Sequence, residues 1–101
     1  MNLNTVTLAG VLKSMAPPKI SDKGTVLDAE VAIASKDRDG NPIEEAIKFV
    51  AFNKTAEALL AMSPGQQIHV QGRIGINEYE RDGQTMRYQT IKAHRVLVEA
   101  I

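Results

Sequence analysis

Residues that could perform acid–base or metal chemistry are few and scattered in this sequence of 101 residues. Cysteine is absent, and the two histidines, His69 and His94, are too far apart to form a metal-ligand motif. No glycine-rich loop has the spacing that cradles a phosphate, and no nucleophile has a base placed beside it. We therefore expect no enzymatic activity, no bound metal and no cofactor. The closest acidic residues flank one predicted turn, as solvated charges commonly do: Asp37, Asp39, Glu44 and Glu45.

A second kind of chemistry is suggested by a lysine and an aromatic ring on one side of a predicted strand. Over residues 43–53 the alternation places an apolar row on one face and a mixed row, which includes Lys48 and Phe52, on the other. A mixed row is typical of a face that points outward. An outward ring beside a cation is suited to a ligand that is both planar and anionic.

The surrounding sequence predicts the elements that position this strand. A helical spacing follows residue 53, with Asn53 as the expected N-cap, and Ser63-Pro64-Gly65 ends it. In the strand after the helix, Ile68, Val70, Ile74 and Ile76 form the row that we expect in the core. Turn signals at residues 38–42 and 81–84 indicate two hairpins. The further strands are predicted at residues 4–12, 25–35, 66–79 and 85–98.

The order of these elements is three strands, a helix and two strands. It is the layout of an OB-fold, an all-β, five-stranded Greek-key barrel in which one short helix between strands 3 and 4 closes one end. A length of 101 residues suits one such domain and leaves no room for a second core. We therefore predict a single OB-fold domain over residues 1–101.

Charge and hydropathy narrow the classes of function. The 12 Lys and Arg residues balance 12 Asp and Glu residues, so any nucleic-acid binding requires the cations to gather on one face. No apolar run reaches the roughly 18 residues of a membrane span. The N-terminus also lacks the basic start and apolar stretch of a signal peptide. We expect a soluble intracellular protein with no membrane partner.

Three segments carry a further pattern. Residues 4–12 read NTVTLAGVL, residues 49–57 read FVAFNKTAE and residues 64–74 read PGQQIHVQGRI. In this order and spacing they resemble the opening strand, the strand-to-helix junction and the K-G-x-x-V-x-V-x-G-x-L stretch of the bacterial and organellar single-stranded DNA-binding protein (SSB) family. The resemblance covers nearly all of the chain. The short length is similar to that of the abbreviated SSB-like proteins of cyanobacteria and plastids.

The resemblance implies a function and a surface for it. It implies sequence-independent binding of single-stranded DNA in replication, repair and recombination, with bases stacked on aromatic rings and phosphates near cations. Phe52 and Tyr79 match stacking positions, and Lys48 and Lys54 match positions near the phosphate backbone. RNA is an alternative ligand, because stacking does not distinguish the two sugars. The predicted nucleic-acid-binding residues are Lys48, Phe52, Lys54, Arg73, Tyr79 and Arg87.

Departures from the family pattern predict weaker binding. Relatives commonly have a tryptophan near Ala46, whereas this sequence has none, and the positions rich in Arg and Lys in relatives hold Gly75, Asn77 and Glu78. Tyr88, on the last strand, is interpreted as a packing residue. The linker and acidic tail by which bacterial relatives recruit other proteins are missing, so we expect no recruitment of that kind.

The polar row of the fourth predicted strand has its own interpretation. Gln67, His69 and Gln71 are expected at an oligomer interface, because Gln and His form hydrogen bonds readily across a two-fold axis. The expected assembly is a homodimer or homotetramer, located in the bacterial cytoplasm with the nucleoid or in the plastid stroma. The alternative function is an OB-fold module for protein–protein interaction or scaffolding with little nucleic-acid affinity.

Overall fold

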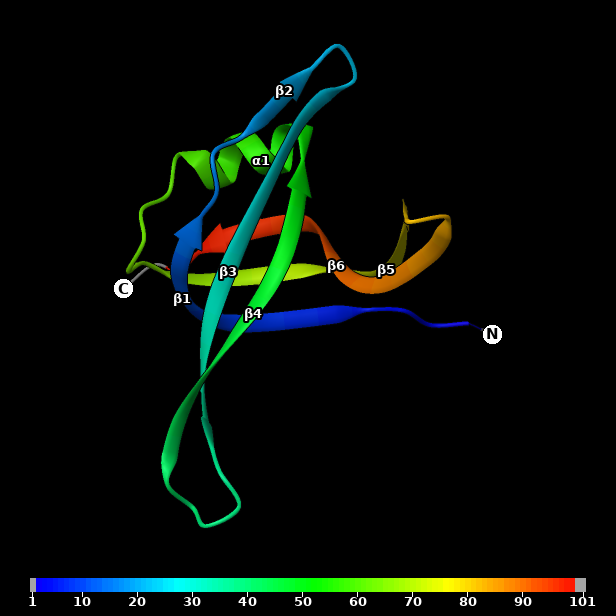
Figure 1. Cartoon of the computed structure of the whole chain (residues 1–101). Coiled ribbons are helices and arrows are strands. Elements are labelled where there is room, and N and C mark those ends of the chain that lie inside the picture. Colours follow the sequence, from blue (N-terminus) through cyan, green and yellow to red (C-terminus); the bar gives the residue numbers. More distant parts are fainter. Residues whose placement is uncertain (1, 100–101) are drawn as a thin grey trace.

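The fold of this chain is described by a computed structural model that covers residues 2–99. Six strands and one helix follow the predicted order, with one short strand added after the first (Figure 1). None of the helices within these residues is long and apolar enough to cross a membrane. The elements are β1 (Val6–Met15), β2 (Lys19–Ser21), β3 (Gly24–Lys36), β4 (Pro42–Phe52), α1 (Asn53–Leu60), β5 (Gln67–Arg81) and β6 (Gln84–Val98).

Strand pairing closes the sheet into a barrel. β1 pairs with both β3 and β5, β3 pairs with β4, and β6 lies between β5 and β4. All of these pairs are antiparallel except β4 with β6, which is parallel. The ring β1–β3–β4–β6–β5–β1 is the five-stranded Greek key of an OB-fold, so the predicted fold is confirmed. The additional strand β2 pairs only with the beginning of β3.

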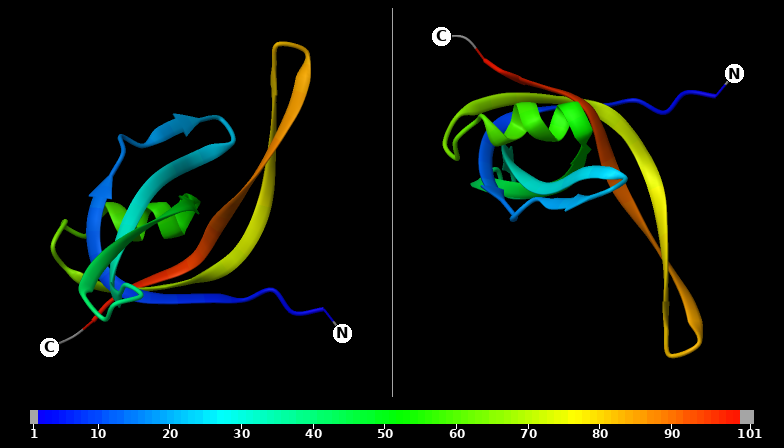
Figure 2. Two further views of the ribbon diagram at one scale, coloured as in Figure 1. Left: turned by 60° about the horizontal axis from the view of Figure 1, so that its bottom comes forward. Right: turned by 90° about the horizontal axis from the view of Figure 1, so that it is seen from above.

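The barrel interior holds the core, and α1 covers one of its open ends (Figure 2). Alternate residues of each strand point inward, as the sequence pattern predicts. The helix has only eight residues, so its stability depends on packing, and Ala56 and Leu59 are its buried contacts. The largest fully buried side chains are Leu12, Leu27, Val31, Phe49, Leu59, Ile68 and Val70.

Two glycines allow neighbouring strands to approach closely enough for closure. A Cβ atom on Gly10 of β1 would clash with the backbone carbonyl oxygen of Ala32 in β3. A Cβ atom on Gly72 of β5 would clash with the backbone carbonyl oxygen of Lys92 in β6. Because backbone atoms cannot move aside as a flexible side chain can, only glycine fits at these two positions.

Two hairpins project from the barrel, one formed by β3 and β4 and the other by β5 and β6 (Figures 1 and 2). They explain a radius of gyration of 15.1 Å, above the roughly 13 Å of a compact domain of 100 residues. The projection overturns one expectation about the core. Ile74 and Ile76 are 42% and 55% exposed, because β5 has left the barrel at these residues.

The junction between β4 and α1 also differs from the prediction. Asn53 is the first residue of α1 and has a left-handed backbone with φ 51°. The helix has no side-chain cap hydrogen bond, so the expected capping role of Asn53 is wrong. Its Oδ1 instead accepts a hydrogen bond from the backbone N–H of Thr25 at 3.2 Å. This contact ties the start of the helix to β3.

Candidate nucleic-acid interface

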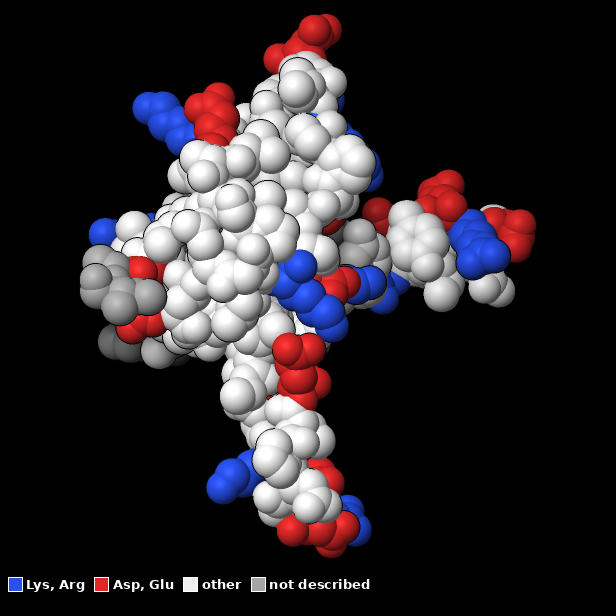
Figure 3. Space-filling model, turned by 90° about the vertical axis from the view of Figure 1, so that its left-hand side faces the viewer, with Lys and Arg blue, Asp and Glu red and all other residues white. Residues whose placement is uncertain are grey.

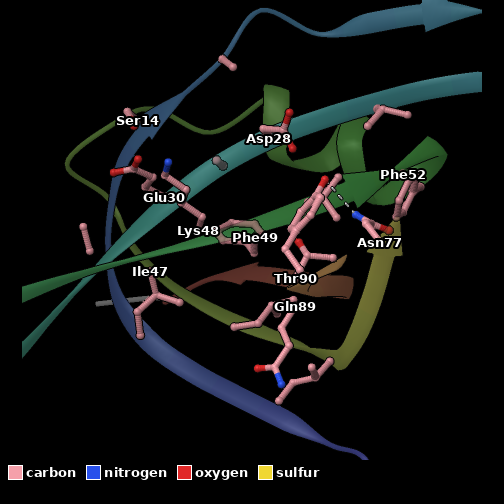
Figure 4. A pocket seen from close by; sticks show the side chains of 18 of the residues that line it. Ser14, Asp28, Glu30, Ile47, Lys48, Phe49, Phe52, Asn77, Gln89 and Thr90 are labelled. Atoms are coloured by element: carbon pink, nitrogen blue, oxygen red, sulfur yellow. Dashed lines mark hydrogen bonds between the residues drawn. The ribbon is translucent and has the colours of Figure 1, made fainter. Parts of the chain in front are cut away.

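A groove of about 1020 Å³ runs along the outer surface of β3 and β4 and continues onto the β5–β6 hairpin (Figure 4). Lys48 and Phe52 from β4 line it, together with Asn77 from β5 and Tyr88 from β6. In an OB-fold, the second and third barrel strands form the face that binds oligonucleotides, and here these strands are β3 and β4. The groove therefore lies where this fold binds its ligands.

The strand register explains why Lys48 and Phe52 share this surface. Phe49 and Ala51 are buried in the barrel, so the alternating side chains of Lys48 and Phe52 point outward. Val50 lies between them on the same outer row and pairs with Lys92 of β6. The outward row that the sequence predicted for this strand is therefore correct, and it lies along the groove.

Two tyrosines extend the aromatic surface from β4 onto the hairpin. Tyr88 lines the groove, and its hydroxyl oxygen accepts a 3.4 Å hydrogen bond from Nδ2 of Asn77. Tyr79 packs edge to face against Tyr88, with ring centroids 5.9 Å apart. Tyr88 is 50% exposed and Tyr79 is 45% exposed. The interpretation of Tyr88 as a packing residue misses its place in the groove.

Arg87 lies on the other face of the hairpin. It pairs in register with Glu78, whereas Tyr79 pairs with Met86. Because successive side chains alternate between faces, Arg87 points away from the two tyrosines. Its Nε also lies 2.9 Å from Oε1 of Glu78. Of the six predicted binding residues, Arg87 is the one whose side chain is turned from the aromatic face and engaged by a carboxylate.

Arg73 and Lys54 lie outside the lining of the groove. Arg73 shares a face of β5 with Tyr79 and pairs with Lys92, so two cations stand together there. Lys54 is exposed in the first turn of α1, two residues after Phe52. Lys92 was not predicted from the sequence, because its strand pattern alone does not reveal which strand lies beside it.

The charges around the groove do not form a continuous basic band. Asp28 and Glu30 of β3 line it together with Lys19 and Lys48. Figure 3 shows one face of the molecule on which acidic and basic side chains lie next to one another and most of the surface is uncharged. Stacking on exposed rings must therefore contribute a large share of any affinity.

The predicted interface residues occupy a different outer surface. His69 pairs with Ala9 of β1 on one side and with Leu97 of β6 on the other. Gln67 and Gln71 lie on the same half-buried row of β5. Nε2 of His69 is 4.0 Å from a carboxylate oxygen of Glu99. Within residues 2–99, no group of three His, Asp or Glu side chains is placed to hold a metal ion.

The sequence matches a known protein family over most of its length. The model of the family described as "Single-strand binding protein family" matches residues 3–98. The chain belongs to this family. Its function is therefore the binding of single-stranded DNA, as the sequence resemblance predicted. The search of curated proteins gave no significant match.

Solved structures agree with the family assignment at the level of the fold. A Plasmodium falciparum SSB in complex with single-stranded DNA has a TM-score of 0.75 at 17% sequence identity. The match covers 99% of this chain and 97% of the Plasmodium chain. A small single-stranded DNA-binding protein from Streptomyces coelicolor has a TM-score of 0.61 at 18% identity, with coverage of 98% and 96%.

A third structure is longer than this chain. Wild-type single-stranded DNA-binding protein from Thermus aquaticus has a TM-score of 0.78 at 23% identity and covers 97% of this chain but 50% of its own length. These likenesses establish the OB-fold architecture. The predicted cyanobacterial or plastid subtype stays a prediction.

Proposed function

We propose that the groove beside β4 is the surface on which this chain binds single-stranded DNA without sequence preference. Bases would stack on Phe52, Tyr88 and Tyr79, and phosphates would meet Lys48 and the pair formed by Arg73 and Lys92. Lys54 would extend the cationic margin beyond Phe52. The observation that carries this proposal is the alignment of exposed rings from β4, β5 and β6 on one outer face of an OB-fold.

The neutral sequence has a direct consequence for the affinity. Each phosphate contact releases condensed counterions, and the slope of affinity against salt reports the number of such contacts. With few cations on this face, the proposal predicts modest affinity and a shallow salt dependence. Stacking on the three rings would supply the part of the binding free energy that salt does not weaken.

A titration tests this function. The full chain is added to labelled oligo(dT) of about 15 nucleotides, within the length that one OB-fold covers, and fluorescence anisotropy is recorded at low salt. Saturable binding supports the proposal, and the triple variant Phe52→Ala, Tyr79→Ala, Tyr88→Ala should lose most of it. Binding that is the same for the wild type and this variant would rule out the groove. A parallel titration with oligo(U) measures the preference between DNA and RNA.

The outer face of β1, β5 and β6 is proposed as the surface for homodimer or homotetramer formation. Its central row of Ala9, His69 and Leu97 combines small, polar and apolar side chains, and Val11 on the same face is 38% exposed. When two copies of the chain pair symmetrically through this face, the groove beside β4 lies on a different surface of each copy. Sedimentation measurements of the wild type and of the His69→Glu variant test it, since two added carboxylates at a two-fold axis should split the assembly.

The biological setting follows from the ligand. A non-enzymatic protein that coats exposed single strands would act in replication, repair and recombination, in the bacterial cytoplasm or the plastid stroma. Scaffolding without DNA was the alternative, and family membership favours DNA binding over it.

A further inference from the structure

Two carboxylates lie on the same outer face as the proposed binding residues. Asp28 is exposed and Glu30 is half-buried, and both line the groove. The register places Glu30 directly opposite Lys48 and Asp28 opposite Val50. Figure 4 shows Glu30 beside Lys48 at one end of the groove and Asp28 farther along β3. A nucleotide chain that follows β4 from Lys48 to Phe52 therefore passes beside both carboxylates.

These carboxylates are not neutralised by ion pairs inside the protein. Among residues 2–99, the ion pairs within 4.0 Å join Lys13 to Glu44, His69 to Glu99 and Arg87 to Glu78. Asp28 and Glu30 belong to none of them. The charged residues that line the groove are two cations and two anions, Lys19, Lys48, Asp28 and Glu30. A phosphate that enters the groove meets no net positive charge.

We propose that Asp28 and Glu30 determine how tightly the groove holds a nucleotide chain, by keeping phosphates away from the β3 side. The inference rests on the proposed function of the groove. Side chains directly opposite on antiparallel strands have Cβ atoms about 5 Å apart, so Glu30 offsets much of the attraction of Lys48 for a phosphate. The bound nucleotide chain then has its bases on the β3 side of the groove and its phosphates on the side away from β3. The result is a weak complex that releases DNA readily.

Removal of each negative charge tests this proposal. The variants Glu30→Gln and Asp28→Asn keep the size and polarity of the side chains and remove only the charge. Each should bind labelled oligo(dT) about threefold to tenfold more tightly at low salt, and the double variant should bind more tightly than either. The gain should shrink at high salt, where charges on the surface are screened.

Two further measurements distinguish an electrostatic role of Glu30 from a merely structural one. They are the dependence of the affinity on salt and the effect of replacing Lys48. If Lys48 contacts a phosphate fully once Glu30 is neutral, the slope of log affinity against log salt should steepen by roughly 0.7 for a single strand. Lys48→Ala should also weaken binding more in the Glu30→Gln background than in the wild type. Equal effects of Lys48→Ala in the two backgrounds would contradict the coupling.

A matched control separates a local effect from a change in net charge. Glu57→Gln makes the same change of charge on an exposed position of α1 that does not line the groove. If the wild type binds and the two groove variants bind no more tightly than Glu57→Gln, the inference is wrong while the proposed function stands. If neither the wild type nor the double variant binds at low salt, the proposed function fails and the inference fails with it.

Discussion

The rings of Tyr79 and Tyr88 meet edge to face across the β5–β6 hairpin, with centroids 5.9 Å apart and ring planes at 62°. They are diagonal neighbours, since Tyr88 pairs with Asn77 and Tyr79 pairs with Met86. This geometry orients each ring without burying it, because an edge contact leaves much of the ring face open. The hairpin thereby presents two oriented aromatic surfaces beside the groove that contains Phe52.

Tyr88→Ala should weaken the binding of oligo(dT) by about tenfold, because one stacked base contributes roughly 1–3 kcal/mol. Tyr79→Ala should also weaken binding, both through its own ring and because Tyr88 loses the ring that orients it. Fluorescence anisotropy at fixed salt measures both effects. Tyr88→Phe keeps the stacking surface and loses only a 3.4 Å hydrogen bond from Asn77, so its affinity should stay close to that of the wild type. Equal losses in the alanine and phenylalanine variants would contradict stacking at Tyr88.

Arg73 and Arg87, which lie on opposite faces of the β5–β6 hairpin, should differ in their effect on DNA binding. Arg73→Gln removes a cation from the tyrosine face and should reduce the salt slope by roughly 0.7. Arg87→Gln should change the affinity by less than about twofold, because Arg87 points to the opposite face and is paired with Glu78 at 2.9 Å. Titrations at several salt concentrations compare the two variants. A larger effect at Arg87 than at Arg73 would show that DNA contacts the other face of the hairpin.

Gly72→Ala should destabilise the barrel by about 1–3 kcal/mol, the typical cost of forcing an added methyl group into packed structure. The new Cβ atom would meet backbone atoms of Lys92 and Ala93, which cannot move without disturbing the β5–β6 pairing. Urea denaturation measures the change in the free energy of unfolding. Gly75→Ala is the matched control on the same strand, because the atoms nearest to its Cβ atom would belong to the flexible side chain of Lys92. Similar losses in the two variants would contradict the backbone clash.

The turn of the β3–β4 hairpin should loosen in acid through Asp37. A hydrogen bond from the backbone N–H of Asn41 is the main cause that lowers the pKa of this carboxyl below its ordinary value of 3.8. A group whose pKa is lowered by folding stabilises the folded form above its unfolded pKa and loses that contribution as the pH falls through the lowered value. The amides of Asp39 and Asn41, which both donate to Asp37 Oδ1, should therefore lose protection against hydrogen exchange, measured relative to their intrinsic exchange rates at each pH.

Substitution of the same residue provides the control at neutral pH. Asp37→Ala removes the acceptor at every pH, so the exchange of these two amides should be rapid at pH 7. The difference from the wild type should shrink as the pH falls below the lowered pKa of Asp37. Protection that does not depend on pH in the wild type would assign the stability of this turn to its backbone hydrogen bonds, such as that from Asp37 N–H to the Asn41 carbonyl at 3.0 Å.

The sequence alone determined the five barrel strands, the helix and the fold. A row with period two can bury its apolar side chains only as a strand, so the positions of the barrel strands, and the outward direction of Lys48 and Phe52, followed from local pattern. The order of the elements, with the motifs at residues 4–12, 49–57 and 64–74, led to the OB-fold and the SSB family, and both are confirmed.

Only the tertiary structure decided which outward residues meet. Alternation assigns a side chain to a face of its own strand but specifies neither the neighbouring strand nor the register. It therefore could not place Tyr88 in the same groove as Phe52, or Glu30 directly opposite Lys48 within the predicted hairpin. It also predicted Ile74 and Ile76 in the core, because the pattern continues unchanged where β5 leaves the barrel. The register shift between Gln71 and Gly72, where Arg95 and then Ala93 are the partners, lies at this departure. Long-range pairing sets these relationships, and a local pattern contains no information about it.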